Sequence, residues 1–183
     1  KVLDNESFWR IWIDGSKVYF QTFRNIYVYD HQTMRQLTIP EGFLLLLKVR
    51  NEYWVQEMHG PLHQLKDGRL SKIEGSEFLN GTTTRVILPY GKDRYLIGTS
   101  TGEIYIYDKK NFIPWNNALS SQLHGQELNC GIYCAKRNSY YLGTQLSGIY
   151  EIDVQGNILN HFSAANSLQN NTILSLYEDN RNN

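Results

Sequence analysis

The residues that could carry acid–base or metal chemistry are five histidines and one pair of adjacent carboxylates. Glu178 and Asp179 follow one another on a predicted strand, where neighbouring side chains point to opposite faces, so we expect them to have a structural role. The histidines lack the HExxH spacing of a zinc site, and no serine lies in a G-x-S-x-G motif. We therefore expect neither a catalytic residue nor a metal site. The histidines are His31, His59, His63, His124 and His161.

The two cysteines and the clustered glycines also have plain structural interpretations. Cys130 and Cys134 are four residues apart on one predicted strand, which separates them by roughly 13 Å. That distance exceeds the reach of a disulfide, so we interpret both as small buried side chains. Glycine pairs such as Gly98 and Gly102 do not stand between a strand and a helix, as a phosphate-binding loop requires. We interpret them as turn glycines and expect no cofactor.

The composition excludes some partners and leaves room for a core. The 183 residues include 41% hydrophobic and 13% aromatic residues, with 18 basic and 18 acidic side chains. This charge balance lacks the basic footprint of a nucleic-acid-binding protein. The longest apolar run, Phe43 to Leu47, is far too short to span a bilayer. We expect a globular chain that contacts no nucleic acid and inserts no segment directly into a membrane.

A repeated hairpin pattern must position whatever site the chain carries. Residues 95–108, YLIGTSTGEIYIYD, alternate like two antiparallel strands joined by a polar turn. The pattern recurs at 140–153 and more loosely at 18–30 and 53–66. The ends of the central strands, at 21, 56, 98 and 143, are 35, 42 and 45 residues apart. Such spacing is typical of a four-stranded propeller blade.

We therefore predict an all-β fold: a partial β-propeller of about four four-stranded blades plus the first strand of a fifth. The predicted blades cover residues 7–40, 43–74, 82–116 and 127–163, and the next begins within 170–183. The first strand of each blade is the most apolar and is expected to be buried on both faces. The fourth is more polar and suits an outer edge. A β-sandwich would also have short strands, but the fixed period favours radial repetition.

The best-matched units resemble the two-component-regulator propeller repeat. Gly143, Thr144, Gly148, Tyr150 and Asp153 match the close of that repeat, as do the equivalent residues of 98–108. The opening of the repeat is matched at 173–179, ILSLYED. Units one and two match less well. The resemblance covers nearly the whole chain and implies a sensor protein of the Bacteroidetes hybrid two-component or triple-tyrosine type.

In such proteins one or two propellers, usually seven-bladed, precede an immunoglobulin-like triple-tyrosine domain, a membrane helix and an output region. The output region is a histidine kinase or a helix-turn-helix regulator. The resemblance therefore implies that this chain is a non-enzymatic, periplasmic piece of a signalling ectodomain, with four blades and the first strand of another. A kinase activity would lie elsewhere in the full-length protein.

The expected positions of the turns make one rim of the propeller the candidate surface for ligand binding. The turns between second and third strands, and the connections between blades, lie on the same face of the ring. This rim gathers polar residues with aromatic Phe23 nearby, which would suit the hydroxyls and flat apolar face of a sugar; an ordinary solvated rim is the alternative interpretation. The candidate ligand-binding residues are Arg24, His59, Thr101, Gln145 and His124.

The leading hypothesis is a ligand sensor that responds to a carbohydrate and signals by a population shift. The alternatives are a scaffold propeller that binds a protein partner through its rim, and a propeller lyase or hydrolase acting on polysaccharide. An arc of blades leaves two blade faces uncovered, and exposed apolar faces drive association. We therefore also expect self-association through these faces.

Overall fold

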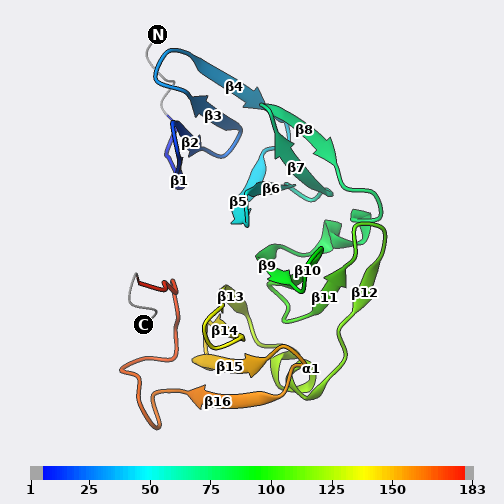
Figure 1. Cartoon of the computed structure of the whole chain (residues 1–183), viewed down its shortest axis with the longest axis vertical. Helices are drawn as coiled ribbons and strands as arrows, with labels where there is room; N and C mark the ends of the chain where they lie inside the picture. Colours follow the sequence, from blue (N-terminus) through cyan, green and yellow to red (C-terminus); the bar gives the residue numbers. More distant parts are fainter. Residues whose placement is uncertain (1–5, 180–183) are drawn as a thin grey trace. The chain divides into compact units, whose positions relative to one another are not determined.

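The computed structural model describes residues 6–179 and divides into two compact units, Lys1–Gly81 and Thr82–Asn183. Each unit contains two four-stranded antiparallel sheets (Figure 1). In every sheet the strands are hydrogen-bonded in sequence order, and among the described residues no strand pairs with another sheet. This is the strand order of propeller blades, and the predicted all-β propeller class is confirmed.

The first unit contains eight strands and a short 3₁₀ helix. The first sheet consists of β1 (Arg10–Asp14), β2 (Lys17–Gln21), β3 (Asn25–Tyr29) and β4 (Met34–Thr38). The second consists of β5 (Phe43–Val49), β6 (Glu52–Glu57), β7 (Leu62–Lys66) and β8 (Arg69–Lys72), followed by η1 (Glu77–Gly81). The strands of the two sheets fall within residues 7–40 and 43–74, the ranges predicted for the first two blades, because alternation and turn residues both define such strands.

The second unit repeats this organisation and adds one helix. The third sheet consists of β9 (Thr84–Tyr90), β10 (Arg94–Thr99), β11 (Ile104–Tyr107) and β12 (Phe112–Pro114). Helix α1 (Ala118–Leu123) lies in the connection to β13 (Leu128–Cys134), β14 (Ser139–Thr144), β15 (Ile149–Asp153) and β16 (Ile158–Phe162). No helix in residues 6–179 is long and apolar enough to cross a membrane.

The predicted first strand of a fifth blade is wrong. Residues 172–179, expected to form the first strand of a fifth blade, form no strand. The Ile173 amide instead donates to the Thr144 carbonyl at 2.9 Å, so this segment lies beside β14, as Figure 1 also shows. A strand needs a hydrogen-bonded ladder on a neighbour, and here single contacts replace it. Pro89 and Tyr90 pair with β10 as the end of β9.

Burial is greatest in an inner strand of each sheet rather than in the first: the third strand, β3, in the first sheet and the second strand in the other three. The second strands β6, β10 and β14 are buried over most of their length, whereas Ile11 and Ile13 of β1 are exposed. An inner strand has a hydrogen-bonded neighbour on both sides, which also shields its side chains. The expectation that the first strands are uniformly buried on both faces is therefore wrong.

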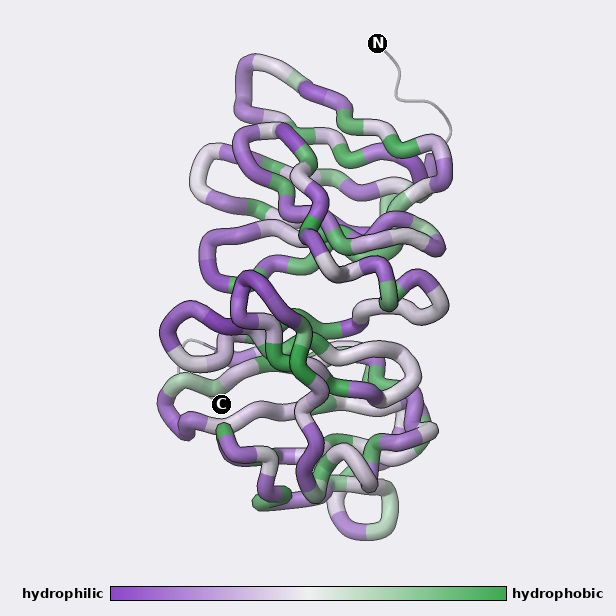
Figure 2. The backbone as a smooth tube through the Cα atoms, turned by 90° about the vertical axis from the view of Figure 1, so that its right-hand side faces the viewer, coloured by the Kyte–Doolittle hydropathy of each residue, from purple (hydrophilic) through white to green (hydrophobic). Residues whose placement is uncertain are grey.

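Each unit has its own hydrophobic core. In the first unit the core joins β2 and β3 to β5, β6 and β7, with Ile26, Phe43 and Val55 fully buried. In the second unit it joins β9–β11 to β13–β15 and includes Leu119 and Leu123 of α1. The hydropathy colouring of Figure 2 follows this pattern, since green apolar stretches lie within strands and purple residues dominate many of the turns.

Aspartates at the ends of third strands stabilise the following turns. The Asp30 carboxylate accepts hydrogen bonds from the backbone amides of Gln32 and Thr33 at 3.1 and 2.6 Å. Asp108 and Asp153 bind the amides of their own turns in the same way. These bonds lower the pKa of Asp30 to about 2. The aspartate that ends the repeated sequence pattern is therefore a turn cap.

Candidate functional site

Helix α1 places His124 at the predicted rim of the second unit. The helix is short, but Asn117 and Ser120 form a reciprocal cap in which the Ser120 amide donates to Asn117 Oδ1 at 3.2 Å. Leu119 and Leu123 bury the opposite side of the helix in the core. His124 follows directly as the C-terminal cap residue and remains exposed.

Gly102 allows the turn between β10 and β11 to approach the end of this helix. Its φ of +82° lies in the left-handed region, and an added Cβ would stand 2.0 Å from the Leu123 carbonyl oxygen. Only glycine tolerates both conditions. The close approach forms a groove of about 290 Å³ beside His124. Its lining residues are Gly102, Glu103, Ile104, Tyr105, Pro114, Asn116, Ser120 and His124.

The groove combines a carboxylate, an imidazole and a phenol. Burial raises the pKa of Tyr105, and the charge and hydrogen bonding of Glu103 raise it further. The Tyr105 hydroxyl is therefore a neutral donor at physiological pH. Thr101 donates to Glu103 Oε2 at 3.3 Å and lies 2.9 Å from the Thr99 hydroxyl. Such a set can donate to and accept from the hydroxyl groups of a ligand.

The structure brings two of the five predicted residues to this groove. His124 lines it, and Thr101 contacts it through Glu103. Gln145 is not among the lining residues, and its backbone amide donates to the Glu127 backbone carbonyl at 2.8 Å. Arg24 and His59 belong to the first unit, so they are described with that unit.

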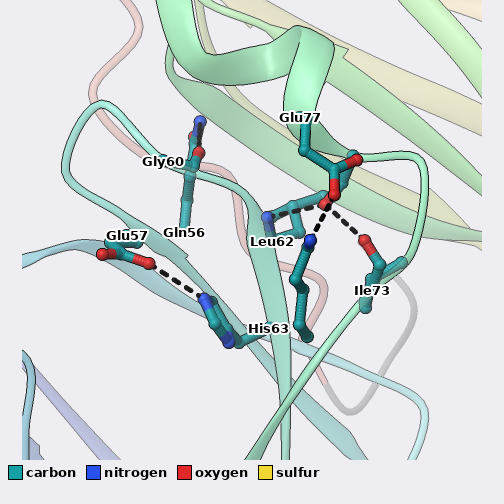
Figure 3. A network of polar contacts seen from close by, with 9 residues as sticks. Gln56, Glu57, Gly60, Leu62, His63, Ile73 and Glu77 are labelled. Atoms are coloured by element: carbon teal, nitrogen blue, oxygen red, sulfur yellow. Dashed lines mark hydrogen bonds and ion pairs between the residues drawn. The ribbon is translucent and has the colours of Figure 1, made fainter.

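His59 and Arg24 both lie in turns between second and third strands, where the sequence placed them. Buried Gln56 stabilises the turn that contains His59. Its side-chain amide donates to the carbonyls of Gly60 at 3.2 Å and Leu79 at 3.1 Å. Figure 3 shows this network, including the contact of 3.2 Å between His63 and Glu57. His59 itself is exposed, with a φ of +54°. Its backbone conformation favours a turn role.

Arg24 lies beside an aromatic pair. Its carbonyl accepts from the Ile39 amide at 3.3 Å, and its side chain is exposed. The neighbouring Phe23 ring packs against Trp9 at 5.8 Å between centroids. The aromatic surface expected near Arg24 is therefore present, although Phe23 is partly engaged by Trp9.

Sequence reasoning missed Glu103, Tyr105 and Ser120. Tyr105 was assigned only to a strand, and Glu103 only to its start. The six-residue helix that carries Ser120 was not predicted as a separate element. A weak signal existed, because Asn117 and Ser120 have the spacing of a helix cap. Among residues 6–179 no three His, Cys, Asp or Glu side chains lie close enough together to hold a metal ion.

No protein-family model matches the sequence, and no curated protein matches it. Solved structures do resemble the fold. One is the extracellular domain of a protein described as the one-component system BT4673 of B. thetaiotaomicron, with a TM-score of 0.69 and 15% identity, covering 94% of this chain and 25% of that one. Another is the extracellular domain described as that of the hybrid two-component system BT3049 of B. thetaiotaomicron, with a TM-score of 0.68 and 18% identity, covering 98% and 25%.

A third similar structure is the computationally designed Ika4 protein, with a TM-score of 0.56 and 13% identity, covering 84% of this chain and 89% of that one. The chain thus spans about a quarter of the length of the two bacterial domains. These two domains come from the class of signalling protein that the sequence pattern resembles. At such identities the likeness shows the fold alone, and that fold is an array of β-propeller blades.

Proposed function

We propose that this chain is part of a ligand-sensing ectodomain in the bacterial periplasm and that its ligand is a carbohydrate. The groove formed by Glu103, Tyr105 and His124 carries the proposal. The likeness of the fold to extracellular domains described as one-component and hybrid two-component systems supports the sensing role. The proposed role is non-enzymatic binding.

The chemistry of the groove favours a neutral, hydroxyl-rich ligand. Glu103 accepts hydrogen bonds, the Tyr105 hydroxyl donates them, and the imidazole of His124 can do either. The partly buried Tyr105 ring offers a flat apolar surface, as sugar rings require. A ligand held here would contact both α1 and the turn at Gly102. It would therefore favour conformations in which these two segments stay together, which is a population shift.

A glycan-array screen followed by calorimetric titration tests this proposal. Replacing Glu103 by Gln or His124 by Ala should weaken binding of the selected glycan about tenfold. Gln122→Ala is the matched control, since Gln122 is exposed on the same helix and does not line the groove. Equal binding by all three variants would contradict the proposed site. Turnover of the glycan would instead support a lyase or hydrolase, and binding only to a protein would support a scaffold.

We also propose that a second copy of the chain covers the outer face of the first sheet. The strand register places Ile11 opposite Phe20, and Ile13 opposite Val18. Met34 continues this face on β4, across from Tyr29, and Phe8 packs on Phe20 and on buried Tyr27. Phe8, Ile11, Ile13 and Met34 are exposed apolar residues of this part of the first sheet. Surfaces of this kind mark association sites.

The outer face of the fourth sheet differs in a way that favours a like-with-like contact. There Glu151, only 4% exposed, accepts from the Tyr141 hydroxyl at 2.6 Å and from Asn160 at 2.5 Å. Burial would raise the pKa of Glu151, but these bonds and Arg137 outweigh it and lower the pKa. A buried carboxylate is a poor partner for an apolar face. Two copies of the first sheet suit each other better.

Light scattering during size-exclusion chromatography tests the association. Ile13→Lys should shift the chain toward a monomer, since a lysine in the middle of the contact must lose its hydration. Leu146→Lys is the matched control, because Ile13 and Leu146 are both 73% exposed. A monomeric parent chain, or equal effects of the two substitutions, would contradict the proposal.

A further inference from the structure

The first unit contains a second cleft, away from the predicted rim. It has a volume of about 470 Å³ and lies at the turns that join first to second and third to fourth strands. Tyr19 and Tyr53 stack in its wall with ring centroids 4.3 Å apart. A smaller cavity of about 230 Å³ adjoins it and shares Lys17, Tyr19 and Asp67. Tyr19 therefore contributes to the walls of both cavities.

The hydroxyl of Tyr53 in this wall has no hydrogen-bond partner. The residue is only 3% exposed, and its Oη is buried and unpaired. Burial raises the pKa of Tyr53, and the nearby Asp14 charge raises it further, so the hydroxyl stays a neutral donor. The Asp14 carboxylate, which contributes to that raised pKa, is itself engaged by Lys48 at 3.1 Å. An unpaired buried hydroxyl costs about 1–3 kcal/mol.

The remaining lining has balanced charge. Two acidic residues, Asp14 and Asp67, and two basic residues, Lys17 and Lys66, line the cleft. Neither an anion nor a cation gains a net attraction there. A neutral ligand with hydroxyl groups can accept from Tyr53 and from the lysines while donating to the carboxylates. The stacked tyrosine rings supply an apolar wall for a sugar ring.

We propose that this cleft is a second saccharide-binding position, in which a ligand hydroxyl accepts the hydrogen bond of Tyr53. The Tyr53 hydroxyl is closed to solvent at rest, so a ligand reaches it when a flexible side chain moves. Lys17 and Lys66 are exposed, long and flexible, and both line the cleft. The inference rests on the proposed carbohydrate sensing for the class of ligand only. Its location and its partner atoms are independent of the His124 groove.

Tyrosine-labelled NMR of the whole chain tests the inference, with ¹³C placed at Cζ. Glucose, galactose, N-acetylglucosamine and myo-inositol are titrated separately at millimolar concentration. At least one should shift the Tyr53 signal, identified by its loss in Tyr53→Phe, and should leave the Tyr140 signal unchanged. Tyr53→Phe should weaken binding of that probe about three- to tenfold. Tyr140→Phe is the matched control and should bind it normally.

The failures of the two proposals are distinguishable. If Glu103→Gln abolishes all saccharide binding and no probe shifts Tyr53, the further inference is wrong while the proposed function stands. If Tyr53 shifts and Glu103→Gln has no effect, the cleft binds sugars and the groove does not. The inference is also overturned if Tyr53→Phe binds every probe as tightly as the parent chain does.

Discussion

Tyr53 and Tyr140 occupy equivalent positions in the two units but differ in the hydrogen bonding of their hydroxyl groups. Each is the second residue of the second strand in the later sheet of its unit. The Tyr140 hydroxyl donates to the Pro89 carbonyl at 2.8 Å, whereas the Tyr53 hydroxyl is unpaired. The residue opposite Tyr140 across the strand pair is Tyr133, and the residue opposite Tyr53 is Lys48.

This difference shows how one unit of a repeat can gain a candidate binding site while its strand arrangement stays the same. In the second unit β9 extends through Pro89 and supplies an acceptor. In the first unit the nearby acceptor is Asp14, which Lys48 already engages. The second unit therefore satisfies its buried tyrosine internally, while the first keeps a donor available. Buried polar groups without partners are rare, so this exception points to function.

The largest expected loss of stability comes from replacing a turn glycine by alanine. The loss should differ between the two units, because the space around their turn glycines differs. Gly102→Ala should destabilise the second unit by about 2–5 kcal/mol, because the new Cβ meets backbone and the φ is strained. Gly15→Ala is the control in the first unit: its φ is +56°, but nothing lies within 4 Å of the added Cβ. It should cost only about 1 kcal/mol. Urea unfolding of both variants provides the test, and equal losses would contradict the close approach of α1.

A smaller effect is expected from removing the two tyrosine hydroxyls. Tyr140→Phe should destabilise the protein by about 1–2 kcal/mol, because the partly buried Pro89 carbonyl loses this donor. Tyr53→Phe should be neutral or slightly stabilising, because it removes an unpaired polar group. Thermal and urea unfolding of the two variants measure the difference directly. If Tyr53→Phe is as costly as Tyr140→Phe, Tyr53 has an internal partner and the comparison fails.

The smallest effect concerns acid stability. Asp30 has a folded pKa of about 2 because the Thr33 and Gln32 amides bind its carboxylate. Backbone bonds from Asn111 and Lys110 lower the pKa of Asp108. Burial raises the pKa of Asp153, but hydrogen bonds from Asn157 and Gln155 outweigh this effect and lower the pKa overall. Each folded pKa lies below the unfolded value of about 3.9, so this stabilisation is complete above that pH and is lost as the pH falls through the folded pKa.

Melting temperatures measured from neutral pH down to about pH 2 check the acid prediction. Replacing Asp108 and Asp153 by Asn should flatten the acid branch for the second unit, and Asp30→Asn should flatten it for the first. Asp93→Asn is the control, since Asp93 is exposed and pairs only with Lys109 at 3.3 Å. An acid branch unchanged in the double variant would show that these caps do not govern it.

Much of the frame could be predicted from local pattern. All sixteen strands of residues 6–179 fall within the four predicted blade ranges, because strand and turn preferences are properties of short segments. The predicted fifth first strand failed because a strand exists only with a partner, which is not a local property. His124 was predicted as a site residue and lines the groove, but its neighbours Glu103 and Tyr105 were missed, since their proximity depends on how α1 packs over the turn.

The amino-acid sequence by itself determined the repeat, the order of the strands and the face on which each tyrosine lies, because a period of two residues specifies these locally. The contacts between sheets decided which hydroxyls found a partner. A hydrogen bond needs an acceptor within about 3 Å at a suitable angle, and that acceptor comes from a segment dozens of residues away. Pro89 supplies it to Tyr140, and packing left Tyr53 without one.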